Sequence, residues 1–408
     1  MTKRLSQTWL VLSPFAAGFF ISNYFRTVNA VISSDLVFDL KLTASELGLL
    51  SSIYFFVTAV FQLPLGLLMD RFGPRRVQSA LMMIASAGVF LFGSANDFLV
   101  ANFGRAVMGL GAAGALMTSF QAITFWFPRE RWPFLNGIVL AAGGMGVLAA
   151  TAPTEQLLHF VSWRELMFGL AALTCAGSLF VLCLVPKGNS HDHGSTLIQQ
   201  LWGVLSIYKN AFFLRIAPIH AATVGGNLAF QGLWAGPWLR DVGYLSAGDA
   251  ANALLFVAVL QICGYVGVGW LAGRLNEMGV GLFSLIRAGT FLFVVSQLGL
   301  LFPNGNVKWI VLIGTGLLAN INVLSYPLLA SHFAPEMVGR LNTALNFFVF
   351  FGAFLLQYSV GEIIGLFEPL AQASYSALSY QIAFAGMLFC QLACWIWLVR
   401  PERKKRAR

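Results

Sequence analysis

Long apolar stretches recur along the whole chain, and short polar segments separate them. Twelve stretches hold about 18 or more residues, enough for an α-helix to cross the ~30 Å hydrocarbon core of a bilayer. They cover residues 9–33, 46–68, 77–95, 98–124, 134–157, 165–186, 211–236, 250–272, 281–302, 308–331, 341–366 and 379–399. The pattern therefore predicts an all-α membrane protein with twelve transmembrane helices.

Composition supports this prediction. Of the 408 residues, 58% are hydrophobic and only 10% are charged, whereas a soluble protein carries about 25% charged residues. The first apolar run is too long for a cleaved signal peptide and leads directly into another span, so we expect it to be a retained helix.

The net charge of +9 could suggest nucleic acid, but the positions of the basic residues favour a membrane topology signal instead. If the spans alternate in direction, the bases fall on one side of the membrane, and Asp35, Asp39, Glu46 and Asp97 lie on the other. Cytoplasmic loops of membrane proteins carry such an excess of Lys and Arg. We therefore expect both termini in the cytoplasm of a bacterial-type inner membrane, a lipid bilayer as the surrounding partner, and no contact with nucleic acid.

The chain divides into two halves of six spans each. The longest polar stretch, KGNSHDHGSTLIQQ, begins at Lys187 and separates them. We predict an N-terminal six-helix bundle at 1–186, a cytoplasmic linker at 187–209, a C-terminal six-helix bundle at 210–400 and a basic cytoplasmic tail at 401–408.

The two halves also resemble each other in sequence. FWFPRERWPFLN, which ends at Asn136, aligns with SHFAPEMVGRLN, which ends at Asn342, and GLLMDR from Gly66 aligns with GWLAGR from Gly269. Internal repeats of this kind mark secondary transporters, whose substrate site lies near the bilayer midplane between the repeats. The sequence therefore predicts two pseudo-symmetric bundles around a central site.

The loop after the second span reads GLLMDRFGPRR. Its Gly-x-x-x-Asp-Arg-x-Gly spacing resembles the signature of the major facilitator superfamily, and with twelve spans and the repeat this resemblance covers the whole chain. It implies that Gly66 permits close helix approach and that Asp70 meets the positive end of the eleventh helix. It also implies that the loop forms a conformational latch for the outward-open state, made by Gly66, Asp70, Arg71, Gly73, Arg75 and Arg76. The second copy has Gly273 in place of the aspartate, which predicts a weaker latch there.

Two arginines lie inside apolar spans. FGRAVMGLG in the fourth span resembles the arginine-containing motif of the superfamily, with Arg105, Gly109 and Gly111 at its positions. Arg26 lies in the first span within SNYFRTVN, which is similar to a first-helix stretch of organic-anion branches of the superfamily, although Tyr24 departs from that spacing by one residue. Both arginines lie about seven residues, roughly 10 Å, from the same membrane face.

Two guanidinium groups at one depth repel each other unless an anion joins them, and a carboxylate or phosphate accepts such groups bidentately. We therefore expect Arg26 and Arg105 to bind an anionic substrate. The alternative for Arg26 is that its side chain reaches to the interface or pairs with backbone carbonyls.

The seventh span, the counterpart of the first, carries polar residues at spacings that place them on one helix face. His220, Asn227, Gln231 and Trp234 make this stripe, and Tyr326 and Asn346 on later spans are candidate companions. A polar stripe in a membrane helix faces a cavity or another helix. We expect these residues to bind substrate, with hydrogen bonding between helices as the alternative for each one alone.

Candidates for proton binding are few. No carboxylate lies deep within a span, Glu362 lies near the end of one, and His220 lies near mid-helix. Histidine titrates in the physiological range, so His220 and Glu362 are the candidate proton-coupling residues. The five cysteines show no metal-ligand pattern, and we predict no metal and no cofactor.

These features predict a secondary transporter that moves a small organic anion by alternating access, with proton-coupled uptake. Efflux of an amphipathic drug or siderophore-like compound is an alternative, and a non-transporting membrane sensor is another. Enzyme motifs such as a nucleophile elbow or a phosphate-binding loop on a soluble domain are missing from the sequence, so we expect no enzymatic activity. Most members of the family that the chain resembles act as monomers, and we expect the same here.

Overall fold

The computed structural model describes residues 2–128, 131–186, 205–302, 306–334, 337–367 and 374–400. Most of the predicted linker, at 187–204, and the whole predicted tail, at 401–408, lie outside the described residues.

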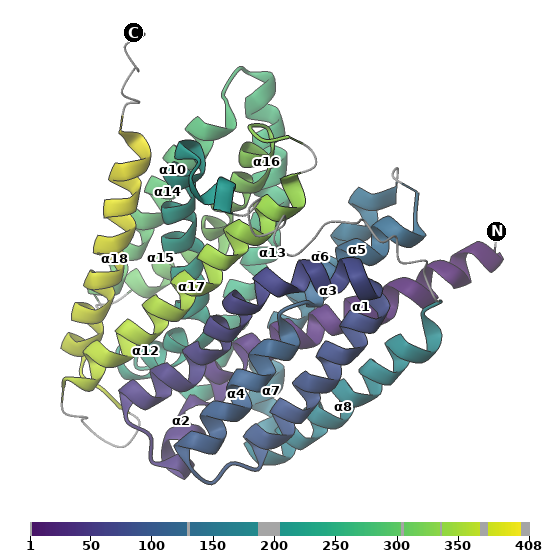
Figure 1. The fold of residues 1–408 in the computed structure, drawn as a ribbon. Helices are drawn as coiled ribbons and strands as arrows, with labels where there is room; N and C mark the ends of the chain where they lie inside the picture. Colours follow the sequence, from purple (N-terminus) through teal and green to yellow (C-terminus); the bar gives the residue numbers. More distant parts are fainter. Residues whose placement is uncertain are drawn as a thin grey trace.

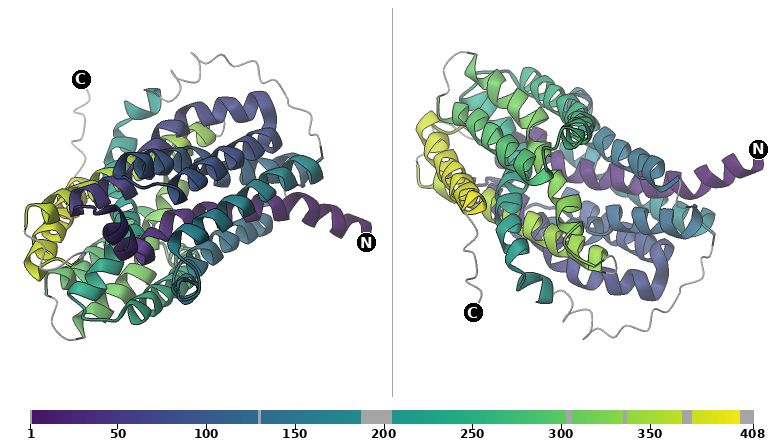
Figure 2. Two further views of the ribbon diagram at one scale, coloured as in Figure 1. Left: turned by 90° about the horizontal axis from the view of Figure 1, so that it is seen from below. Right: turned by 90° about the horizontal axis from the view of Figure 1, so that it is seen from above.

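The described elements of the first half are helices, coloured from purple through blue to teal in Figure 1. They are α1 (Thr2–Thr27), α2 (Asn29–Leu40), α3 (Ala44–Gly93), α4 (Phe98–Ala112), α5 (Ala115–Trp126), α6 (Trp132–Ala149), α7 (Ala152–Leu158) and α8 (Trp163–Leu184). The N-terminal end of α1 projects beyond the other helices, as both views of Figure 2 show.

The second half begins with a seventh span that is built from several short pieces. These pieces are α10 (Ala211–His220), the π-turn η2 (Ala221–Gly225), α11 (Gly226–Ala229), the π-turn η3 (Phe230–Trp234) and α12 (Ala235–Asp241). The other elements are α13 (Ala247–Glu277), α14 (Leu282–Gln297), η4 (Leu298–Leu301), α15 (Val307–Leu317), η5 (Ala319–Leu324), α16 (Ser325–Ala330), α17 (Val338–Gly365) and α18 (Ala377–Val399).

Nine helices in the described residues are long and apolar enough to cross a membrane, and the bent pair formed by α6 and α7 makes a tenth. The protein is therefore an all-α, multi-pass membrane protein. Two of the twelve predicted spans are not among these ten: the first, which is divided between α1 and α2, and the seventh, which is divided between α10 and α12. The exact number of twelve stays a prediction.

Local sequence explains where the helices break. Gly73 within α3 has φ of 75°, a conformation that glycine adopts at little cost, and this turn separates the second predicted span from the third. Pro218 lies inside α10 directly before η2 and lacks the backbone N–H that a regular helix needs. The N-terminal ends of α3 and α8 are stabilised by capping boxes, in which Thr43 and Ser162 are the N-cap residues.

Small residues allow α4 to pack directly on α3. A Cβ added to Gly109 would lie 2.5 Å from the Tyr54 carbonyl oxygen, and one added to Gly111 would lie 2.3 Å from the Ala85 nitrogen. Neither position has room for a side chain. This close approach, expected from the glycines of the fourth span, brings Arg105 against α3.

The two halves meet along α3 and α17, which run side by side through the centre of Figure 1. Phe55 stacks on Phe350 with ring centroids 6.4 Å apart, and Phe56 contacts Phe354 at 5.0 Å. Toward the start of α3 the backbones themselves touch, because a Cβ on Gly361 would lie 3.0 Å from the Cα of Gly48. The halves are therefore sealed at the end of the molecule where α3 begins and α17 ends.

Arg164 ties together the loops at this same end of the first half. Its guanidinium donates to the carbonyl oxygen of Ala95 at 2.7 Å, lies 3.7 Å from the Asp39 carboxylate, and stacks 4.3 Å from the ring of Trp163. The Trp163 indole also donates to Asp39 at 2.8 Å. The side chain of Arg164 thus links the end of α3 to α2 and α8.

We expect Arg164→Ala to lower the free energy of unfolding by about 1–2 kcal/mol, because the ion pair is partly exposed and the hydrogen bonds are few. Thermal unfolding of the purified protein in detergent measures this effect. Because Arg164 contacts Ala95, Asp39 and Trp163 and none of the candidate site residues, we expect the KM for transport to stay unchanged. A shifted KM together with normal thermal stability would contradict this structural role.

Candidate functional site

Arg105 lies in the interior of the first half with only 1% of its surface exposed. Its Nη1 donates to the carbonyl oxygen of Phe25 at 3.0 Å, and its guanidinium lies 5.1 Å from the ring centre of Tyr54 and 5.7 Å from that of Phe92. Its Nε has no hydrogen-bond partner, and no carboxylate of the described residues lies within 4.0 Å of it. Its positive charge is therefore met by a carbonyl and by aromatic faces, not by an acid.

Arg26 follows Phe25 directly, so the hydrogen bond from Arg105 brings the Arg105 guanidinium to the backbone next to Arg26. The Arg26 side chain is partly exposed and interacts electrostatically with the hydroxyls of Tyr54 and Tyr265. A Cβ added to Gly232 would lie 3.3 Å from the Arg26 carbonyl oxygen. Arg26 therefore lies where the first half faces the second.

Tyr54 connects the two arginines, and the sequence analysis did not identify it. It supports Arg105 with its ring, interacts electrostatically with Arg26, and donates its hydroxyl to the Ser22 carbonyl oxygen at 3.1 Å. The only signal in the sequence is one phenol in an otherwise apolar span. That signal is weak, because a membrane tyrosine also serves in ordinary packing.

A polar cluster in the second half contains three of the predicted site residues. The rings of His220 and Tyr326 meet edge to face at 5.2 Å, and the Tyr326 hydroxyl donates to the Asn346 side-chain oxygen. His220 is buried, and neither of its ring nitrogens forms a hydrogen bond, although the backbone of Asn322 lies nearby. These residues come from α10, α16 and α17, which converge here.

The polar residues predicted to form one stripe on the seventh span lie in different surroundings in the structure. Gln231 donates to Asn227 at 3.2 Å, but Trp234 is buried between α3 and α17, where its indole donates to the Gln357 carbonyl oxygen at 3.0 Å. The physical reason is that η2 and η3 are π-turns, each of which takes up an extra residue and rotates the following positions around the helix. The expected single face is therefore wrong, and Trp234 takes part in the seal between the halves.

Glu362 also lies in this seal. Its carboxylate accepts a hydrogen bond from the Ser45 hydroxyl at the start of α3 and interacts with the Tyr358 hydroxyl one turn earlier on α17. The structure thus separates the two proton-coupling candidates, with Glu362 at the end of the bundle and His220 inside the second half.

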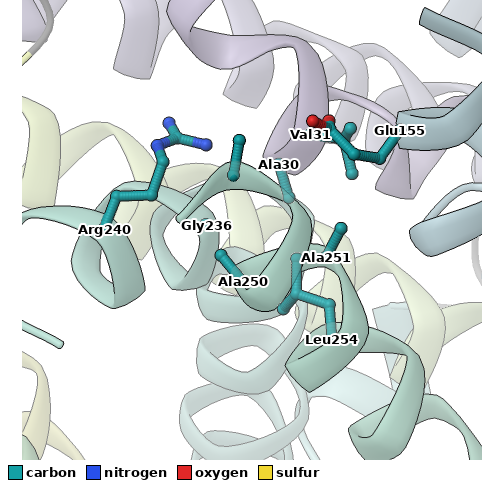
Figure 3. Close-up of a pocket in the computed structure, with 9 residues that line it drawn as sticks. Ala30, Val31, Glu155, Gly236, Arg240, Ala250, Ala251 and Leu254 are labelled. Atoms are coloured by element: carbon teal, nitrogen blue, oxygen red, sulfur yellow. The ribbon is translucent and has the colours of Figure 1, made fainter. Parts of the chain in front are cut away.

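A further cross-connection between the two halves lies between α2 and α12. Arg240 donates to the Ser33 hydroxyl at 2.9 Å, and a Cβ on Gly236 would lie 2.1 Å from the Ala30 carbonyl oxygen. Figure 3 shows Arg240 and Glu155 on opposite sides of a small pocket at this seam. Charged groups of both halves therefore face each other across the sealed end.

The latch residues lie around the kink at Gly73, in the middle of α3. Asp70 is partly buried, the Arg75 guanidinium donates to the Leu182 carbonyl oxygen at the end of α8, Arg71 lies 5.3 Å from the ring centre of Phe72, and Arg76 is exposed. A Cβ added to Gly66 would have no heavy atom within 4 Å. The close helix approach expected at Gly66 does not occur in this conformation, and the meeting of Asp70 with the eleventh helix stays a prediction.

Solved transporter structures share this arrangement of helices. A bacterial homologue of the human lysosomal transporter Spinster, solved in an inward-facing and occupied conformation, superposes with a TM-score of 0.71 at 16% sequence identity. The alignment covers 95% of this chain and 94% of that one. At this level of identity the likeness concerns the fold.

Curated relatives are transporters as well. The chain is 27% identical over 202 residues to a probable sulfoacetate transporter, SauU, of Cupriavidus necator, a match that covers 49% of this chain and 46% of the relative, so the matched segment spans about half of that protein. It is 22% identical over 397 residues to the nitrite extrusion protein of Bacillus subtilis, which covers 95% of this chain and 93% of that relative.

These likenesses agree with the apolar helices and with the repeated halves of the sequence. The family model of the Major Facilitator Superfamily matches residues 15–357, which is most of the chain. The chain therefore belongs to the Major Facilitator Superfamily.

Proposed function

We propose that this transporter moves a small organic anion across the membrane by alternating access, with the anionic group of the substrate held by Arg26 and Arg105. The observation that carries the proposal is that Arg26 and Arg105 both interact with Tyr54 and that no acid of the described residues neutralises either of them. Like charges in a medium of low dielectric constant repel strongly. A substrate carboxylate, sulfonate or phosphate relieves this repulsion and accepts charge-assisted hydrogen bonds from both groups.

The names of the matched relatives support an anionic substrate. One is a probable carrier of sulfoacetate and the other is named for extrusion of nitrite, and both of these compounds are anions. Export of an anion is the second candidate, because the relative that matches along nearly its whole length is named for extrusion. The drug-efflux alternative lacks a carboxylate deep in a span that would hold a cationic compound.

Alternating access would proceed by rocking the bundle at 1–186 against the bundle at 210–400. In this conformation the halves touch at Gly48 and Gly361, and Gly66 at the other end faces open space. With both termini in the cytoplasm of an inner membrane, as the basic loops indicate, the open end faces the cytoplasm. Formation of the latch around Asp70 would then close this end, and the protein would complete the cycle as a monomer.

The most informative experiment is uptake into proteoliposomes of labelled monocarboxylates, dicarboxylates, sugar phosphates and amino acids, each with and without an inward proton gradient. We expect one class of anion to accumulate and the gradient to increase its accumulation. Transport of only neutral or cationic compounds would contradict the proposal. If the labelled compound instead moves from the inside of the proteoliposomes to the outside under the same conditions, the direction of transport is export.

Proton coupling is tested by the double variant His220→Ala with Glu362→Gln. If either residue carries the coupled proton, this variant still exchanges substrate down its concentration gradient but no longer concentrates it under a proton gradient. Counterflow of labelled substrate without any gradient serves as the control for folding and binding. Undiminished concentration by the double variant would remove both candidates.

A further inference from the structure

The two halves differ in where their charged side chains lie. In the first half Arg26 lies in the last turn of α1, just before α2 continues the same predicted span, and Arg105 lies at the middle of α4. In the described part of the second half, by contrast, every charged side chain lies within the first or last two turns of a membrane helix or in a loop. These residues are Lys209, Arg215, Arg240, Asp241, Asp249, Arg274, Glu277, Arg287, Lys308, Arg340, Glu362 and Arg400.

At mid-depth the second half offers neutral hydrogen-bonding groups instead. Gln231 lies next to Gly232, which approaches the backbone of Arg26. The Tyr326 hydroxyl is paired with Asn346. Both the amide and the phenol can donate and accept hydrogen bonds, but neither supplies a positive charge to pair with an acid.

Tyr265 on α13 links these groups to the arginines. Its side chain is 52% exposed although it lies near the middle of α13, and it interacts electrostatically with both Arg26 and Tyr326. Tyr265 is therefore within electrostatic range of Arg26 in the first half and of the Tyr326 hydroxyl in the second. The sequence analysis did not identify it, because a single phenol in an apolar span has no distinctive spacing.

We infer that the substrate is polar at both ends but charged at only one: its anionic group binds the first half, and an uncharged, hydroxylated end binds Tyr265, Tyr326 and Asn346 of the second. This inference rests on the proposed function and narrows the substrate class to hydroxylated acids with their charge at a single pole. A second carboxylate at the far end of the substrate would lose its hydration without gaining a positively charged partner. Desolvating an unpaired charge in this way is costly in such a site.

The test uses three six-carbon compounds that differ only at their ends: an aldonate with one terminal carboxylate, the matching aldarate with two, and the alditol with none. Each competes with the labelled anion that proteoliposomes take up. We expect the aldonate to compete at least about tenfold better than the aldarate, and the alditol not to compete. A four-carbon pair, threonate and tartrate, controls for length.

An aldarate or tartrate that competes as well as its one-acid partner would overturn the inference, and so would a series in which no hydroxylated acid competes. Both outcomes are compatible with the proposal that the protein transports an anion. If the proteoliposomes transport no anion at all, the proposed function fails as well, so the two failures are distinguishable.

The variant Tyr326→Phe tests the hydroxylated end separately. It removes one hydrogen-bonding group and keeps the ring against His220, so we expect the KM for the aldonate to rise about threefold to tenfold, and inhibition by unsubstituted propionate to stay unchanged. Tyr208→Phe is the matched control, because the Tyr208 hydroxyl has no hydrogen-bond partner and lies near the end of the helix bundle. Equal effects of Tyr326→Phe on both acids would contradict the assignment of this pole.

Discussion

Replacing Arg26 by alanine is expected to reduce kcat/KM for anion uptake by about 100-fold or more. A hydrogen bond to a charged group contributes about 1.5–3 kcal/mol, an arginine forms two with a carboxylate, and 1.4 kcal/mol corresponds to a tenfold change. The side chain is partly exposed and the described residues provide it with no acid partner, so its loss leaves no buried acid unpaired. Uptake into proteoliposomes at matched protein density measures the effect.

The lysine variant of the same residue serves as the control. Arg26→Lys keeps the positive charge but loses the planar, bidentate geometry, so we expect it to retain part of the activity with a raised KM. Arg105 is less suited to this test, because its hydrogen bond to Phe25 and its contacts with two rings also stabilise the first half. Full activity of Arg26→Ala with the wild-type KM would show that Arg26 does not bind the substrate.

Replacing Gly361 by alanine is expected to open the sealed end of the transporter. The new Cβ would lie 2.9 Å from the Ala44 carbonyl oxygen and 3.0 Å from the Cα of Gly48. Because both neighbours are backbone atoms, they cannot move aside as a side chain would. Overpacking of this kind costs about 1–3 kcal/mol, which would reduce the ratio of sealed to open molecules by about fivefold to 150-fold.

Labelling with a membrane-impermeant maleimide measures this shift. In a background without the five native cysteines, a Ser33→Cys probe at the seal reacts faster when Gly361→Ala is present. Gly269→Ala is the matched control, since a Cβ there would have no heavy atom within 4 Å. An unchanged rate of labelling, with the protein still folded, would mean that the contact between Gly48 and Gly361 does not hold the halves together.

Much of the fold could be predicted because the bilayer imposes a simple rule. A helix that crosses the hydrocarbon core must be long and apolar, so the spans and the superfamily signature near Asp70 were apparent in the sequence. The interruptions inside the spans were not apparent. The break between Thr27 and Asn29 and the π-turns after His220 depend on how neighbouring helices satisfy the freed backbone groups, which hydropathy alone does not describe.

The site could be predicted only in part, for a related reason. A charged residue in an apolar span is conspicuous, so Arg26 and Arg105 were identified. Tyr54 and Tyr265, which interact with them electrostatically, were missed because a phenol is common in membrane helices. Trp234 was assigned to the wrong surroundings because the prediction assumed a regular helix across residues that form two π-turns.

The measurement that tests the arginine pair most directly compares a transported carboxylate with its own carboxamide. The two compounds have nearly the same size and shape and differ in charge, so competition against uptake of the labelled acid isolates the charge. If the substrate carboxylate binds to Arg26 and Arg105, the amide competes at least about 100-fold more weakly than the acid. Equal competition by acid and amide would contradict an anion site at these arginines.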